Sequence, residues 1–139
     1  MAFFDPEDWL EVAEVCCDRL PGVGQEALLR TALNRAYYAA LLCVKRRIEG
    51  VHGRGAVPAF RTHAAILSAV RSGGSLFADI HLGLRKLQAR RDAADYELQS
   101  DPLVWSRVHA QVGLSRELIR NRIKALPDAE FRRLALPPK

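Results

Sequence analysis

The stretch from about Gln25 to Glu49 constrains the fold of this chain more than any other part of the sequence. It reads QEALLRTALNRAYYAALLCVKRRIE, and its middle is apolar on nearly every side. Such a pattern is typical of a central helix that several neighbours cover. A helix of about 25 residues is roughly 37 Å long, so shorter helices can pack along it. The sequence therefore predicts a bundle built around this one helix.

Capping signals and helix breakers divide the rest of the chain into further helical segments. Asp5 and Pro6 fit an N-cap and a first helical position, and Pro21 and Gly22 end the helix that follows. Three more helices are expected at about 62–71, from about 75 through 96, and from about 100 to 126, with one or two turns after Pro127. No segment alternates in polarity as a strand would. We expect an all-α, up-down bundle of about five helices.

The size and charge of the chain bound its organisation and its partners. Its 139 residues fit one domain over 1–139, with a core over about 5–126 and a short C-terminal tail over 127–139. The net charge is +5, and only four of the 21 basic residues are lysines. Arginine suits bidentate contact with phosphate, so this composition fits a nucleic-acid partner. A bias toward arginine codons, together with solvated helix faces, explains it equally well.

The cysteines and the N-terminus indicate a cytoplasmic protein. Cys16, Cys17 and Cys43 form no metal-binding spacing and are expected to be reduced, buried thiols. No apolar run reaches the length of a membrane span, and MAFFDPEDW does not resemble a signal peptide. We expect no membrane association, no metal and no cofactor, because glycine-rich phosphate loops and histidine–carboxylate clusters are not seen in the sequence.

Arg35 is the one charge in the apolar stretch LNRAYYAALL. An unpaired charge in an apolar interior costs several kcal/mol, so Arg35 should be paired or should face a polar cleft. The segment ARRDAADYEL offers a complement, and we expect a salt bridge from Arg35 to Asp95. The alternative is that Arg35, Arg91 and Tyr96 line a polar groove.

Three short motifs in this order carry a family resemblance. RAYYAAL begins at Arg35, THAAIL at Thr62 and RRDAADYEL at Arg90. They resemble the HEPN domain (higher eukaryotes and prokaryotes nucleotide-binding), whose patterns fall here on residues 35–39, 62–65 and 90–96. The resemblance spans about residues 25–125. It implies an all-α bundle that is commonly a homodimer.

The resemblance also implies a function linked to RNA. Many HEPN proteins are metal-independent RNA endonucleases of toxin–antitoxin, CRISPR and phage-defence systems, with arginine, four to six residues, then histidine at a site shared by two copies. Arginine would stabilise charge on the scissile phosphate, histidine would act as acid or base, and the 2′-hydroxyl would attack. Here four residues lead from Arg91 to Tyr96, and tyrosine is a poor base at neutral pH because its pKa is near 10.

These observations leave three functions open. The first is an RNA- or nucleotide-binding module, partner of a nucleotidyltransferase or part of a toxin–antitoxin or defence system. The second is an endoribonuclease with Arg91 and Tyr96 as the catalytic pair, and the third is an assembly module without a ligand. The residues expected to bind RNA or line the groove are Arg35, Tyr38, His63, Arg90, Asp95, Arg116 and Arg120.

Two further basic patterns have a functional and a structural explanation. RIEGVH, from Arg47 to His52, matches arginine-x4-histidine, but about one such match is expected by chance among this many arginines. The fifth helix carries Arg107, Arg116, Arg120, Arg122 and Lys124. Arg116 and Arg120 are four residues apart and should share a face that tracks an RNA backbone or simply meets water.

Overall fold

The computed structural model describes residues 4–18, 25–96 and 107–137, and within these ranges every regular element is helical. Six of the elements are α-helices: α1 (Glu7–Asp18), α2 (Gln25–His52), α3 (Thr62–Ser72), α4 (Ala78–Tyr96), α6 (Val108–Glu117) and α7 (Asp128–Arg132). Short 3-10 helices η1 (Ala59–Arg61) and η2 (Gly74–Phe77) precede α3 and α4, and η3 (Leu118–Ile123) is a π-helix. The all-α prediction is confirmed.

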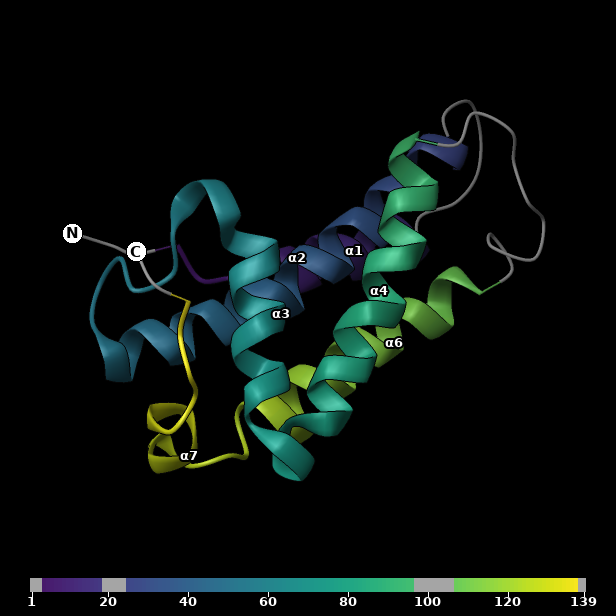
Figure 1. Ribbon diagram of the computed structural model, residues 1–139. Coiled ribbons are helices and arrows are strands. Elements are labelled where there is room, and N and C mark those ends of the chain that lie inside the picture. The colour runs from purple at the N-terminus through teal and green to yellow at the C-terminus, as the bar shows by residue number, and fades with distance from the viewer. Residues whose placement is uncertain (1–3, 19–24, 97–106, 138–139) are drawn as a thin grey trace.

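The central position predicted for the second helix is confirmed. In Figure 1, α2 crosses the molecule, with α1 along one side of it and α3 and α4 crossing the other. Its main packing partners are α1, α4 and α6. Four of the fully buried residues of α2 are alanines, which let these helices approach closely. The fully buried residues are Ala32, Leu33, Ala36, Tyr37, Ala39, Ala40, Leu41, Val44 and Ile48. The helix runs to His52, slightly beyond its predicted end.

The N-terminal cap has the predicted geometry. The backbone N–H of Glu7 donates to Asp5 Oδ1 at 3.0 Å, which satisfies one of the free donors of the first turn of α1. The predicted end at Pro21 and Gly22 lies outside the described residues. Between α3 and η2 the predicted break is present, and Gly74 there has a φ of +69°, which favours glycine.

Two of the three cysteine thiols are buried, as expected. Cys17 and Cys43 are buried and Cys16 is partly exposed, and all three are free thiols. Burial raises the pKa of Cys43 to about 12 and, with a contribution from Asp18, that of Cys17 to about 11. Both thiols are therefore protonated at neutral pH and act as small apolar side chains.

The fifth predicted helix changes its geometry after Glu117. The backbone N–H of Lys124 donates to the carbonyl of Ile119 at 3.0 Å, a five-residue step that belongs to a π-helix. Arg116 lies in α6 and Arg120 in the π-helix, so the two arginines belong to segments of different helical geometry. The predicted start at 100–102 lies outside the described residues.

The C-terminal segment belongs to the core, which extends past its predicted limit at residue 126. Phe131 and Leu134 are buried, and the ring of Phe131 packs edge-on against Phe77, with 5.2 Å between centroids. Arg47 donates to the carbonyls of Ile123 and Leu126, at the end of the π-helix. The predicted tail therefore closes one end of the bundle.

The arginine and the histidine of RIEGVH both contact this C-terminal segment. The guanidinium of Arg47 lies 4.4 Å from the centroid of the Phe131 ring and pairs with Asp128 at 3.0 Å. His52 Nε2 lies 2.9 Å from the carbonyl oxygen of Phe131. These contacts give the motif a structural role.

In the described ranges, no helix is both long and apolar enough to cross a membrane.

A pair of glycine substitutions tests the packing of α4 against η3. A methyl group at Gly83 would lie 2.4 Å from Leu118 Cδ1, and Leu118 is itself buried. We expect Gly83→Ala to lower the free energy of unfolding by about 1–3 kcal/mol through overpacking. At Gly113 of α6, an added methyl group would have no heavy atom within 4 Å. Gly113→Ala should therefore raise the free energy of unfolding by about 0.5–1 kcal/mol. Urea denaturation measures both, and equal effects would contradict the packing.

Candidate functional site

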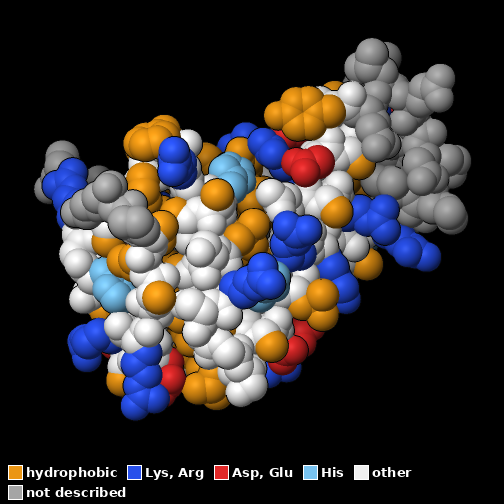
Figure 2. All heavy atoms as spheres, in the orientation of Figure 1, with side chains coloured by type: hydrophobic (Ala, Val, Ile, Leu, Met, Phe, Trp, Pro, Cys, Tyr) orange, Lys and Arg blue, Asp and Glu red, His pale blue; other side chains and the backbone are white. Residues whose placement is uncertain are grey.

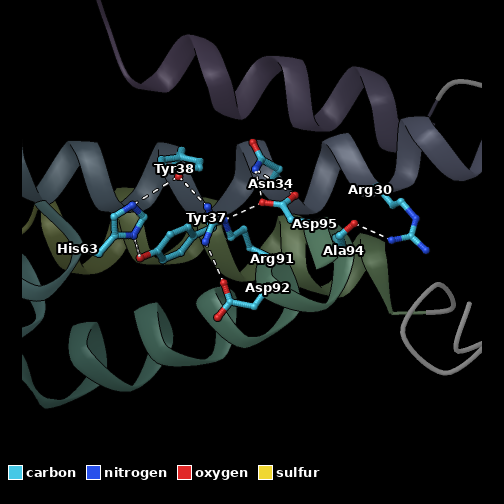
Figure 3. A network of polar contacts seen from close by, with 9 residues as sticks. All are labelled: Arg30, Asn34, Tyr37, Tyr38, His63, Arg91, Asp92, Ala94 and Asp95. Carbon is cyan, nitrogen blue, oxygen red and sulfur yellow. Dashed lines mark hydrogen bonds and ion pairs between the residues drawn. The ribbon is translucent and has the colours of Figure 1, made fainter. Parts of the chain in front are cut away.

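The three motif segments meet in one network of polar contacts, shown in Figure 3. Helix α2 supplies two adjacent tyrosines, α3 supplies a histidine near its start, and α4 supplies an arginine and two aspartates near its end. The members of this network are Asn34, Tyr37, Tyr38, His63, Arg91, Asp92 and Asp95. We call it the Tyr–His–Arg network.

His63 lies between the hydroxyls of Tyr37 and Tyr38. Its Nδ1 is 2.7 Å from the Tyr37 oxygen, and its Nε2 is 3.4 Å from the Tyr38 oxygen. Tyr37 is fully buried, and Nδ1 is the acceptor that the described residues offer to its hydroxyl hydrogen. We therefore assign a neutral ring in which Nδ1 accepts from Tyr37 and Nε2 donates to Tyr38.

The surroundings of His63 keep the imidazole neutral. Burial lowers its pKa from the ordinary value, the positive charge of Arg91 lowers it further, and Asp92 opposes this in part. Protonation would also convert Nδ1 into a donor and leave the buried Tyr37 hydroxyl without an acceptor. His63 is thus a hydrogen-bonding group at neutral pH and resists becoming a cation.

Arg91 is held on three sides. Its Nη1 donates to Asp92 at 2.8 Å and its Nη2 donates to the Tyr38 oxygen at 3.0 Å. Its Nε lies 2.9 Å from Asp95 Oδ2, an ion pair without the angle of a hydrogen bond. Burial acts to lower the pKa of Arg91, but the hydrogen bond to Asp92 and the nearby acidic groups outweigh it and raise the pKa. The guanidinium is therefore charged, fixed and locally neutralised.

The predicted salt bridge from Arg35 to Asp95 is wrong. Asp95 pairs with Arg91, four residues earlier on its own helix, and accepts from Asn34 Nδ2 at 3.0 and 3.3 Å. The guanidinium of Arg35 instead lies 4.3 Å from the centroid of Trp9 on α1 and 5.8 Å from that of Tyr38. Its charge is stabilised by aromatic faces, which leave that charge unneutralised.

Tyr96 and Arg90 occupy different positions around the end of α4. Tyr96 is 72% exposed, and its ring centroid lies 5.8 Å from the Arg91 guanidinium carbon. Arg90 is half-buried, and successive residues of a helix are separated by about 100°. Arg90 and Arg91 therefore point to different sides of α4, and the described contacts do not include Arg90 in the network.

The basic residues of α6 and η3 mostly pair with acidic side chains of other helices. Arg116 lies 3.0 Å from Glu14, Arg122 lies 3.4 Å from Asp79, and Lys124 lies 2.7 Å from Glu7. Arg120 is exposed. The predicted RNA-tracking face is therefore interrupted by carboxylates that could not be located from sequence, because they lie on other helices.

Asn34 and Trp9 were missed by the sequence reasoning, although each had a weak signal. Asn34 precedes Arg35 and lies on the buried stretch, where an amide needs partners. Trp9 is the large aromatic of α1, the helix that packs most extensively on α2. Asn34 contacts Asp95 in place of the predicted Arg35, and Trp9 contacts Arg35 in place of the predicted Asp95.

One group of metal-ligand types lies elsewhere in the described part of the chain. Cys17, Asp18 and His109 each offer one ligand atom, and these atoms lie within 4.8 Å of one another. Asp18 and His109 are exposed and their side chains are 3.5 Å apart. The raised pKa of Cys17 opposes the thiolate that a zinc ion would require.

Comparison of the chain with family models, with curated proteins and with solved structures finds no match. A function for this protein must therefore be inferred from the resemblance of the three motifs to the HEPN domain and from the contacts among their side chains.

The depressed pKa of His63 predicts that the protein loses stability as the pH is lowered. In the unfolded chain histidine titrates near pH 6.5, and in the folded protein His63 titrates lower, so the unfolded state binds more protons in that interval. The free energy of unfolding should decrease as the pH falls from about 6.5 toward the folded pKa. Urea midpoints at several pH values would show this decrease, and His63→Gln should make it smaller. An unchanged pH profile in the variant would contradict the assignment.

Proposed function

We propose that this protein is a HEPN-like module that binds RNA or a nucleotide, as the partner of a nucleotidyltransferase or a component of a toxin–antitoxin or phage-defence system. One observation carries the proposal. The motifs that resemble the family lie far apart in the sequence, yet Tyr38, His63 and Arg91 are joined through one hydroxyl. Packing of an all-α bundle does not by itself require these polar side chains to meet.

The state of Arg91 favours binding over catalysis. Its side chain is only 16% exposed, and Asp92 and Asp95 oppose its charge. Carboxylates beside the guanidinium weaken the charge stabilisation that it could offer to a cleaved phosphate. Tyr96 replaces the histidine of the nuclease pattern, and an exposed tyrosine ring suits stacking on a base better than proton transfer.

A specific observation also supports the endoribonuclease as a second candidate. Nε2 of His63 lies 3.4 Å from the Tyr38 oxygen, which accepts from Arg91 at 3.0 Å. An imidazole from α3 thus lies near the arginine of α4 although residue 96 is not histidine. In a homodimer, two copies of this pair would form the composite site that the family resemblance implies.

RNA binding and cleavage can be measured in one experiment. We expect the purified protein to shift labelled single-stranded RNA in EDTA, to leave the RNA intact, and to lose affinity as salt rises. Arg91→Lys, which keeps the charge but breaks the fixed fork, should weaken binding at least several-fold. Arg132→Ala is the matched control, because Arg132 is an exposed arginine of α7.

The other outcomes separate the candidates. If cleavage survives EDTA and disappears in Arg91→Lys, the endoribonuclease replaces the binding module as the proposed function. If neither RNA nor nucleotides bind or react, the assembly module without a ligand is the function that remains. Circular dichroism of each variant guards against loss of folding, and a sizing column tests the proposed homodimer.

A further inference from the structure

Two large aromatic side chains are exposed beside the Tyr–His–Arg network. Phe60 of η1 is 85% exposed and Tyr96 at the end of α4 is 72% exposed. Scattered apolar side chains are ordinary on a protein surface. These two differ because Tyr96 lies near Arg91 of the network and Phe60 is three residues before His63 in the sequence.

The two rings belong to different elements next to the network. Phe60 lies in η1, the 3-10 helix that leads into α3, three residues before His63. The ring of Tyr96 lies near Arg91, which is bonded to Tyr38, the neighbour of His63. Figure 2 shows apolar side chains protruding at two points of one edge of the molecule, with histidine, basic and acidic side chains between them.

The charge available on this face is positive. Arg61 lies 5.5 Å from the Phe60 ring, and Arg85 shares a face of α4 with Asp92, seven residues later. Neither arginine has an ion-pair partner among the described residues, whereas the aspartates of the network are engaged by Arg91.

We propose that this face binds an unpaired stretch of RNA, with bases stacked on Phe60 and Tyr96 and phosphates near Arg61 and Arg85. The inference rests on the proposed RNA-binding function and specifies its ligand. Exposed rings stack on free base faces, which a duplex does not present. Phe60 lies in η1 and Tyr96 ends α4, so we expect the two rings to hold different bases of one strand. Positive charge beside the rings complements a phosphate backbone.

The decisive measurement is fluorescence anisotropy with a labelled single-stranded RNA of ten nucleotides in EDTA. Phe60→Ala and Tyr96→Ala should each raise the Kd roughly 5- to 100-fold, because each removes one base stack. Tyr96→Phe restores the ring that Tyr96→Ala removes and should recover most of the lost affinity. Leu76→Ala and Leu82→Ala remove other exposed apolar side chains and should also leave the Kd unchanged.

Competition distinguishes the RNA stretch from other nucleic-acid ligands. Unlabelled single-stranded RNA should displace the probe, while a duplex of the same length and a mononucleotide should require at least tenfold higher concentrations. A mononucleotide that competes equally well would overturn the extended binding face.

Failure of this inference can be told apart from failure of the proposed function. If the unchanged protein binds RNA and the two alanine variants bind equally well, the aromatic face is refuted and RNA binding stands. Equal loss in the leucine controls would also refute it. If the unchanged protein binds no RNA, the proposed RNA function fails and this inference fails with it.

Discussion

Burial of α2 on several sides is the constraint on which the rest of the structure depends. On the covered faces of such a helix, polar side chains have no water, so neighbouring helices must supply their partners. Tyr37 meets that requirement through His63 of α3. The reverse contact also occurs, because the buried hydroxyl of Ser115 on α6 donates to the backbone carbonyl of Ala36 at 2.6 Å. Hydrogen bonds to α2 thus fix how the surrounding helices sit around it.

Local features of the fold could be predicted from the sequence, whereas contacts between helices could not. The cap at Asp5 and the start of α2 follow from residues close in sequence, and both predictions were confirmed. Asn34 and Arg35 are adjacent on α2 and point about 100° apart. Only the packing of the helices decides which of the two meets Asp95. The π-helix after Glu117 has an ordinary helical sequence, and no local signal marked its five-residue hydrogen bond. Tyr38, His63 and Arg91 lie far apart in the sequence, and only the motif resemblance singled out all three before the structure showed their contacts.

Two arginines in the same region have opposite electrostatic environments. Arg91 is bound by two carboxylates, which fix its position and cancel its charge locally. Arg35 rests on the faces of Trp9 and Tyr38, which stabilise a cation without cancelling it. A sequence pattern that contains both does not distinguish them. The distinction matters for function, because a neutralised arginine serves hydrogen-bond geometry and an aromatic-supported arginine still attracts anions.

The Tyr–His–Arg network is already ordered before any ligand arrives, and this has a thermodynamic consequence. Tyr37 is buried, and Arg91 is held by groups on α2 and α4, so neither has much rotamer freedom left to lose. Immobilising a free side chain on association costs about 0.5–1.5 kcal/mol, and the folding of the bundle has met that cost for these groups in advance. The entropy lost on association would therefore come mainly from the ligand and from the exposed rings beside the network.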